Sequence, residues 1–252
     1  MKTSNYWLGH FKNNALQQRI NWEVAPNITR QEVNAILSSL RAWQLGETSE
    51  GRSLIAAATK YAHEINDPLF LEVIKLFIKE EQKHGNNLGM YLDRIGKPRK
   101  TKDWGDSLFR WTRHLNTHME SWTLAVIVVE STAQIFYQAL KDATNCTLLK
   151  SICTDILIDE AYHILFQNER LAEIFERKSV WSQQWRKPVY RYFFYATATL
   201  VWLANKRLFN AGGITLGSYF KKMRYKYHKT IEIITGQQVN NENSNLKLKY
   251  GL

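Results

Sequence analysis

Two short stretches of the chain repeat one pattern of acids and a histidine. Residues 80–84 and 159–163 each read acid, glutamate, two further residues, histidine. A glutamate and a histidine three positions apart project from the same side of an α-helix. Sites rich in carboxylate oxygen, with one imidazole per ion, suit iron or manganese. The repeat therefore predicts two metal-binding segments, each on its own helix.

The residues before both motifs indicate that they face a hydrophobic core. Apolar side chains recur at intervals of three and four, at Phe70, Ile74 and Phe77 before the first motif and at Leu149, Cys153 and Ile156 before the second. That spacing marks the buried side of a helix. A buried carboxylate is costly unless it is paired or binds a metal. The motifs are therefore expected to point inward and to hold ions.

Two further glutamates are expected from two other helices. Glu130 follows an apolar run of four residues, 126–129, which favours its burial. Glu47 and Glu50 both lie on an earlier apolar stripe. In an antiparallel helix pair, ligands at one level lie equidistant from the turn. Glu50 places that turn on the breaker Asn66-Asp67, whereas Glu47 places it inside the helix. We therefore predict Glu50 as the ligand and Glu47 as an outer neighbour.

The predicted ligand set combines single glutamates from two helices with a glutamate–histidine pair from each of two others: Glu50, Glu81, His84, Glu130, Glu160 and His163. Four carboxylates balance the charge of two divalent ions. The alternative is that surface acids and core histidines share these stripes without a metal. One Glu-x-x-His alone would not exclude that alternative, but two of them on apolar stripes favour metal binding.

The elements that must position these ligands are long helices. The chain has only 4 Pro and 12 Gly in 252 residues, so turns are few. Thr29 and Glu32 form a capping-box pattern at the start of the first expected helix. The predicted helices span 29–65, 69–95, 120–142 and 147–177, with a long connection at 97–118 that includes a short helix at 107–113.

The ligand pattern and this helix order resemble the ferritin-like di-iron superfamily, which includes ribonucleotide reductase small subunits, acyl-carrier-protein desaturases, bacterial multicomponent monooxygenases and rubrerythrins. The resemblance covers residues 29–177. It implies an all-α four-helix bundle with one long crossover and a cofactor of two iron ions, with manganese as the alternative metal. By the same likeness, Asp159 orients His84 and Glu80 orients His163 from outside the ligand shell.

The expected organisation of the chain has four parts: an N-terminal arm at 1–28, the di-iron bundle at 29–178, two additional C-terminal helices packed on the bundle at 179–235, and a disordered tail at 236–252. The apolar run at 190–204 is shorter than the ~20 residues that span a membrane, so no transmembrane span is expected. No apolar run of signal-peptide type opens the chain, which predicts a cytoplasmic protein. Peripheral contact with a membrane is left open.

The net charge of +11 favours an acidic partner, such as anionic lipid, an acidic carrier protein or RNA. No DNA target is expected. Cys146 and Cys153 are too few for a rubredoxin-type site, which argues against a self-contained rubrerythrin. A homodimer is left open.

The first functional hypothesis is an oxidoreductase, an oxygenase that activates O₂ to hydroxylate, desaturate or N-oxygenate a small organic substrate. That substrate could be free, carrier-bound or lipid-like, and an electron-donor protein would serve the centre. Small side chains near the ligands, Ala57, Ala58 and Ala133, predict an apolar pocket beside the metals. The alternatives are a ferroxidase or peroxide scavenger of rubrerythrin type, and a di-iron hydroxylase directed at RNA or a carrier protein.

Overall fold

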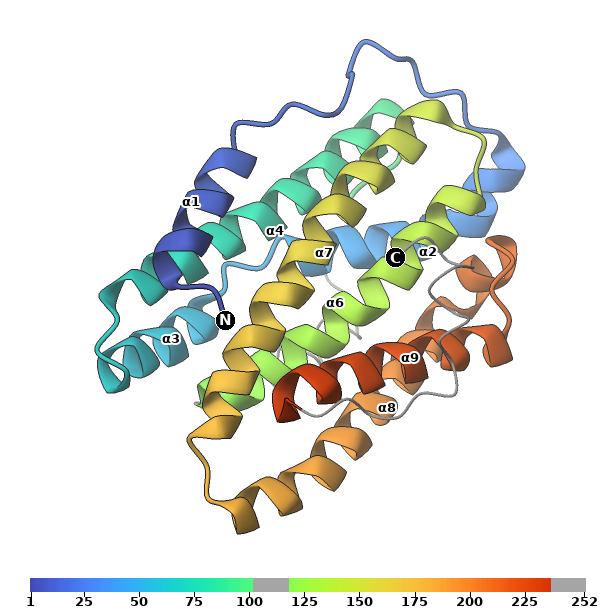
Figure 1. Ribbon diagram of the computed structural model, residues 1–252. Coiled ribbons are helices and arrows are strands. Elements are labelled where there is room, and N and C mark those ends of the chain that lie inside the picture. The colour runs from blue at the N-terminus through green and yellow to red at the C-terminus, as the bar shows by residue number, and fades with distance from the viewer. Residues whose placement is uncertain (102–117, 237–252) are drawn as a thin grey trace.

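The computed structural model describes residues 1–101 and 118–236, and this part of the chain is built from eight helices without a strand (Figure 1). The expected short helix at 107–113 and the tail beyond residue 236 lie outside the described residues. The helices are α1 (Ser4–Asn14), α2 (Arg30–Glu47), α3 (Arg52–Glu64), α4 (Pro68–Arg94), α6 (Met119–Asp142), α7 (Thr147–Glu176), α8 (Val180–Ala211) and α9 (Leu216–Thr235).

Local capping explains where the first long helices begin. The Thr29 side chain accepts a hydrogen bond from the Glu32 backbone, and the Glu32 carboxylate accepts one from the Thr29 backbone, which confirms the predicted capping box. Asp67 caps α4 by accepting from the Leu69 N–H, and Pro68 occupies the first helical position, where its missing N–H is not needed. These contacts satisfy backbone groups that helix ends leave free.

The predicted continuous helix at 29–65 is wrong, because the chain leaves the helical path between Glu47 and Arg52. Gly51 adopts a positive φ of 64°, and a β-carbon there would lie 2.6 Å from Ile78 Cδ1. Glycine alone meets both requirements without strain. The break divides the element into α2 and α3, and it takes Glu50 out of the helix.

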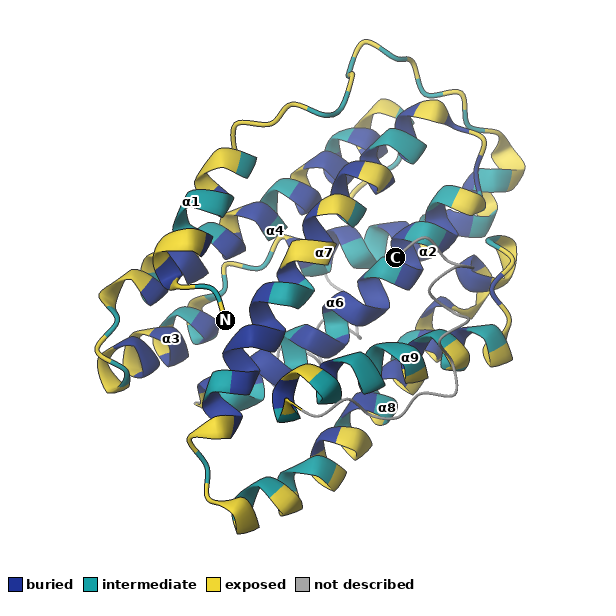
Figure 2. Cartoon of the chain, in the orientation of Figure 1, coloured by how far each residue is buried: buried dark blue, intermediate teal, exposed yellow. Residues whose placement is uncertain are grey.

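The helices pack around a shared core that holds the motifs. α6 packs along α7, α4 contacts α1, α2, α3 and α7, and α8 and α9 cover α6, α2 and α7. Buried faces line the inside of these layers, and α6 and α7 are buried along most of their length (Figure 2). Of the described helices, only α6 is long and apolar enough to cross a membrane, but 72% of its most apolar stretch lies inside the protein.

Candidate metal centre

The two histidines of the repeated motifs face each other across α4 and α7. The ring centroids of His84 and His163 are 5.7 Å apart, and both side chains are fully buried. The Nδ1 atom of each ring turns toward the carboxylates: His84 Nδ1 lies 3.8 Å from Glu160 Oε1, and His163 Nδ1 lies 2.8 Å from Glu81 Oε1. The motifs therefore point inward, as the apolar spacing predicts.

Six side chains from four helices form two overlapping groups of possible metal ligands. One group is Glu81, Glu130, Glu160 and His163, and the other is Glu47, Glu81 and His84; in each group the potential ligand atoms lie within 4.8 Å of one another. Glu81 belongs to both groups. Such overlapping donor sets are suited to two ions that share a bridging carboxylate.

The inward atoms of this cluster lack the hydrogen bonds that burial normally requires. Among the described residues, no hydrogen-bond partner exists for Glu81 Oε1, His84 Nδ1, His163 Nδ1 or either carboxylate oxygen of Glu160. Although Glu81 Oε1 and His163 Nδ1 are close, they are not aligned for a hydrogen bond. Buried polar atoms without partners are costly. Divalent metal ions would satisfy all five atoms at once, so the residues fit such ions.

Glu50 does not join this cluster, which corrects the choice between the two glutamates of the first helix. The Glu50 side chain is 66% exposed, and its carboxylate pairs with Arg52 Nε at 2.5 Å. Glu47 is buried and lies with Glu81 and His84. The turn-reflection argument failed because it assumed an unbroken helix; α2 ends at Glu47, and Glu50 lies in the irregular segment before α3.

A close approach between α2 and α4 brings Glu47 to His84. Gly85 lies directly after that histidine, and a β-carbon at Gly85 would lie 2.8 Å from Thr48 Cγ2 and 3.1 Å from the backbone carbon of Glu47. Gln44 also donates to the Gly85 carbonyl at 3.4 Å. The absent side chain at residue 85 therefore makes room for the last turn of α2.

Two aromatic side chains hold the outer oxygen of Glu47. Trp43 Nε1 donates to Glu47 Oε1 at 2.8 Å, and the Tyr137 hydroxyl of α6 donates to the same oxygen at 2.7 Å. Tyr137 is fully buried in this contact. Both donors bind the same oxygen, Oε1, of the Glu47 carboxylate.

The outer nitrogens of the two histidines are held by the acids that precede the motifs, in a crossed arrangement. His84 Nε2 lies 3.0 Å from Asp159 Oδ2, and His163 Nε2 lies 2.7 Å from Glu80 Oε2. These are the two contacts that the family resemblance implies. A carboxylate on Nε2 favours the tautomer with hydrogen on that atom, which leaves the Nδ1 lone pair for a metal.

Residues of the N-terminal arm cover the outer side of this arrangement. Asn14 donates to both Glu80 and Asp159, and Arg19 donates to Asp159 at 2.6 Å and forms an ion pair with Asp155 at 2.8 Å. Lys83 of α4 also pairs with Asp159, at 2.7 Å. The sequence did not indicate these three contacts, since Asn14 and Arg19 lie outside the motifs, Lys83 is one of the two variable residues of its motif, and the arm carries no spacing that relates it to α7.

Electrostatics within the cluster reflect the shared burial of acids and histidines. Burial and repulsion from Glu81 and Glu160 raise the pKa of both Glu47 and Glu130 well above the usual range. Burial acts to raise the pKa of Glu81 as well, but His163 outweighs it and lowers that pKa to about 2. Burial opposes the charging of His163, yet Glu81 and its neighbours raise its pKa well above 6.5. Binding of cations would displace the protons that this cluster otherwise holds.

A buried amide lies one helical turn beyond His163. Gln167 of α7 is fully buried, and neither its amide nitrogen nor its amide oxygen has a hydrogen-bond partner within the described ranges. The sequence placed Gln167 on the core stripe without a role. A buried amide without partners is an available donor and acceptor next to the candidate metal centre.

Comparison with family models, with curated proteins and with solved structures returned no match to this chain. The function is therefore inferred from the geometry of the site.

Proposed function

We propose that the chain is a ferritin-like di-iron oxidoreductase that uses O₂ to oxidise a small organic substrate. The broken helix α2–α3 would take one position of the four-helix bundle, and α4, α6 and α7 the other three. The proposed ligands are Glu47, Glu81, His84, Glu130, Glu160 and His163. The observation that best supports this proposal is that five buried donor atoms without hydrogen bonds converge from the two repeated motifs.

When bound, two iron ions would supply the reduction of O₂ and the oxidation of the substrate, with further electrons from a donor protein. The chain's own residues would set the geometry. Glu81 belongs to both donor groups, so it would serve as a ligand shared by the two ions. Asp159 and Glu80 fix the histidine tautomers, and Trp43 and Tyr137 orient Glu47. Such outer contacts commonly change metal affinity 10- to 100-fold.

Support for an organic substrate comes from small and unsatisfied side chains in the core of the same helices. Ala57, Ala58 and Ala133 are all buried, so little side-chain volume occupies these core positions. Gln167 offers an unsatisfied amide that could hydrogen-bond a polar group of the substrate. A ferroxidase or a peroxide scavenger would need neither feature. The apolar pocket beside the metals stays a prediction, and so does the electron donor.

The test begins with metal content. Protein loaded anaerobically with Fe²⁺ should hold about two ions per chain. Glu160→Ala should lose at least one, whereas Glu50→Ala, the matched control on an exposed glutamate, should lose none. Failure of the wild-type protein to bind a transition metal would overturn the proposal.

Activity is tested on the loaded protein. A single turnover with O₂, followed by mass spectrometry of copurified small molecules, should show a product heavier by one oxygen or lighter by two hydrogens. Gln167→Leu should reduce that yield and leave iron content unchanged. Iron oxidation or peroxide consumption without any organic product would favour the ferroxidase or peroxide-scavenger alternative, and a modified RNA or carrier protein would favour the macromolecule-directed hydroxylase.

A further inference from the structure

The outer face of α8 carries a continuous stripe of exposed apolar side chains. Six large ones are between 49% and 80% exposed: Trp181, Trp185, Val189, Tyr192, Leu200 and Leu203. With the exposed Ala196 they recur at intervals of four, four, three, four, four and three residues. That spacing keeps them on one side of the helix over about 33 Å.

The opposite side of α8 is the one that packs on the protein. Tyr190, Phe194, Ala198 and Trp202 are buried, and α8 contacts α6 and α2. The helix therefore does cover the core, as the sequence predicts for the run at 190–204, but it also has a second apolar face that the described residues leave uncovered. Contiguous apolar surface of this extent commonly marks a binding surface.

The charges on α8 indicate what this face binds. The helix contains no Asp or Glu, and its five cations are Arg186, Lys187, Arg191, Lys206 and Arg207. Arg186 pairs with Glu120 of α6. Arg191, Lys206 and Arg207 are exposed beside the stripe or one turn beyond its end. A second copy of this face would bring like charges together without an acid to neutralise them, which disfavours a symmetric dimer through α8.

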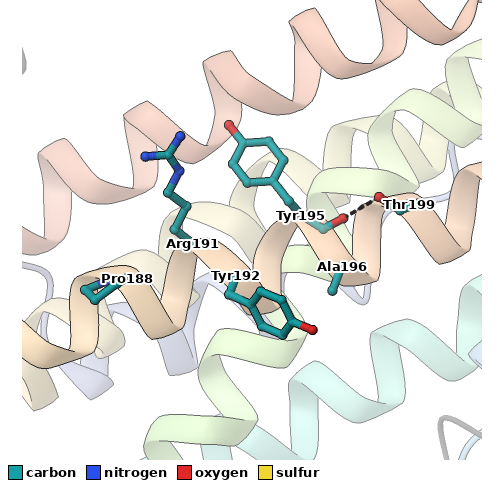
Figure 3. Close-up of a pocket in the computed structure, with 6 residues that line it drawn as sticks. All are labelled: Pro188, Arg191, Tyr192, Tyr195, Ala196 and Thr199. Atoms are coloured by element: carbon teal, nitrogen blue, oxygen red, sulfur yellow. Dashed lines mark hydrogen bonds between the residues drawn. The ribbon is translucent and has the colours of Figure 1, made fainter.

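A groove in the middle of the stripe combines apolar and cationic lining. It has a volume of about 410 Å³ and is lined by Pro188, Arg191, Tyr192, Tyr195, Ala196 and Thr199 (Figure 3). In that view Arg191 and Tyr195 extend toward one side of the helix and Tyr192 toward the other. The Arg191 guanidinium on the same side as the Tyr195 ring, with the small side chains of Ala196 and Thr199 nearby, suits a lipid phosphate with the start of its acyl chain.

We propose that the outer face of α8 docks on an anionic lipid bilayer, with the helix axis parallel to the membrane plane. Trp and Tyr are favoured at the boundary between headgroups and acyl chains. Exposed Arg and Lys beside an apolar face add attraction to anionic headgroups. Trp181, Trp185 and Tyr192 are the aromatic side chains of the stripe that would lie at this boundary. Arg191 and Lys206 are the exposed cations that would attract the headgroups. This docking does not depend on metal binding.

The test is flotation of the full chain with vesicles of phosphatidylcholine that contain about 30% phosphatidylglycerol, at low salt. Wild-type protein should bind these vesicles and should bind pure phosphatidylcholine far more weakly. The double variant Trp181→Ser/Trp185→Ser should reduce binding at least about tenfold, because two large apolar surfaces are lost. Leu16→Ser, at another highly exposed apolar residue, is the matched control and should bind as wild type.

The charge contribution is tested separately. Arg191→Glu/Lys206→Glu should reduce binding by about fivefold or more, and Lys60→Glu on the exposed side of α3 should not. Because every substituted side chain is exposed, far-UV circular dichroism and thermal unfolding should match the wild type.

A site-specific probe gives an independent readout. Both native cysteines are buried, so Val189→Cys can be labelled with an environment-sensitive fluorophore. Its emission should rise on anionic vesicles, whereas the same label at Leu16→Cys should not respond. Wild-type protein that does not bind anionic vesicles would overturn the proposal. So would unchanged binding by the tryptophan variant, or a dimer in solution that this variant dissociates.

Discussion

His84 and His163 face one cluster of acids, but different parts of the protein hold them. The acid behind His84 is Asp159, which also pairs with Lys83 and Arg19 and accepts from Asn14. Glu80, behind His163, accepts from Asn14 as its second partner. Burial acts to raise the pKa of Asp159, yet His84 and Lys83 lower it strongly. The two near-identical motifs thus give a site with two unequal halves, one around His84 and one around His163. They differ because Arg19 of the N-terminal arm adds a cation only to the half around His84.

The largest expected effect concerns the residue that joins the halves. Glu81→Ala should abolish binding of both ions, because Glu81 belongs to both donor groups. Glu130→Ala and Glu47→Ala should each retain about one ion, since each belongs to one group only. Elemental analysis after anaerobic loading measures this difference. Two ions bound by the Glu81 variant would show that the halves are independent.

The second effect compares the two outer acids. Asp159→Asn should lower the free energy of unfolding by about 3 kcal/mol, because it removes a fully buried carboxylate that pairs with Arg19 and Lys83 and leaves these cations only Asp155. Glu80→Gln breaks no pair with Lys or Arg, so about 1 kcal/mol is expected. Both variants should weaken metal binding about 10- to 100-fold. Denaturant unfolding of the metal-free proteins checks the order, and equal losses of stability would contradict the asymmetry.

The third effect concerns pH and separates four inner groups with raised pKa values from Asp159 and Glu81, whose pKa values are lowered. The pKa values of Glu47, Glu130, His84 and His163 are raised in the folded protein. Such groups stabilise the fold fully below their unfolded pKa, and this contribution is lost as pH rises through the folded pKa. Metal-free protein should therefore lose about 1–3 kcal/mol of stability between about pH 5 and pH 9.

Asp159 acts in the opposite direction. Its lowered pKa contributes stability above its unfolded value of about 3.9, which is lost only at lower pH. Metal-loaded protein should gain stability over the range where the metal-free protein loses it, because the ions compete with the same protons. The Glu47→Gln/Glu130→Gln variant should flatten the metal-free profile. Thermal unfolding across this pH range is the measurement, and a metal-free protein that becomes more stable toward pH 9 would contradict it.

The smallest effect lies within the half that contains Glu47. Tyr137→Phe removes one of two hydrogen bonds to Glu47 Oε1 and should cost about 1 kcal/mol in metal affinity, close to fivefold. The loss should fall on the ion nearer His84 and leave the other unchanged. Tyr190→Phe, which removes a similar hydroxyl contact to Glu120, is the control. Stepwise metal titration checks this, and an equal loss at both ions would contradict it.

Most of the helices and five of the cluster residues could be predicted from spacing alone. The apolar period placed Glu81, His84, Glu160 and His163 on core faces, because burial imposes one side on each long helix, and a continuous apolar run indicated the burial of Glu130. The failure at Glu50 has a local cause. The segment 46–51 contains two glycines with Thr48 and Ser49, all poor helix formers, and this signal for a break was outweighed by the apolar stripe around it.

Contacts made by residues outside any periodic apolar pattern could not be predicted from the sequence. Arg19 and Asn14 lie in a segment of mixed composition, and their partners are about 140 residues away in the sequence. The exposed stripe of α8 was also hidden, since its apolar residues surround the helix on both faces and sequence alone does not show which face packs. The close approach at Gly85 depends on the position of α2, which the spacing within α4 does not contain.

The contacts of the N-terminal arm set an order of events during synthesis. Trp7, Asn14 and Arg19 leave the ribosome first, but their partners Glu169 and Asp159 follow about 140–160 residues later. At about 5–20 residues per second, these contacts with α7 form roughly 7–30 s after the arm leaves the ribosome. Asn14 also donates to Glu80, so the arm can pack on α4 during that interval, before Glu160 and His163 have been made. Full closure of the site is thus a late step of maturation, completed only when α7 joins α4 and the arm.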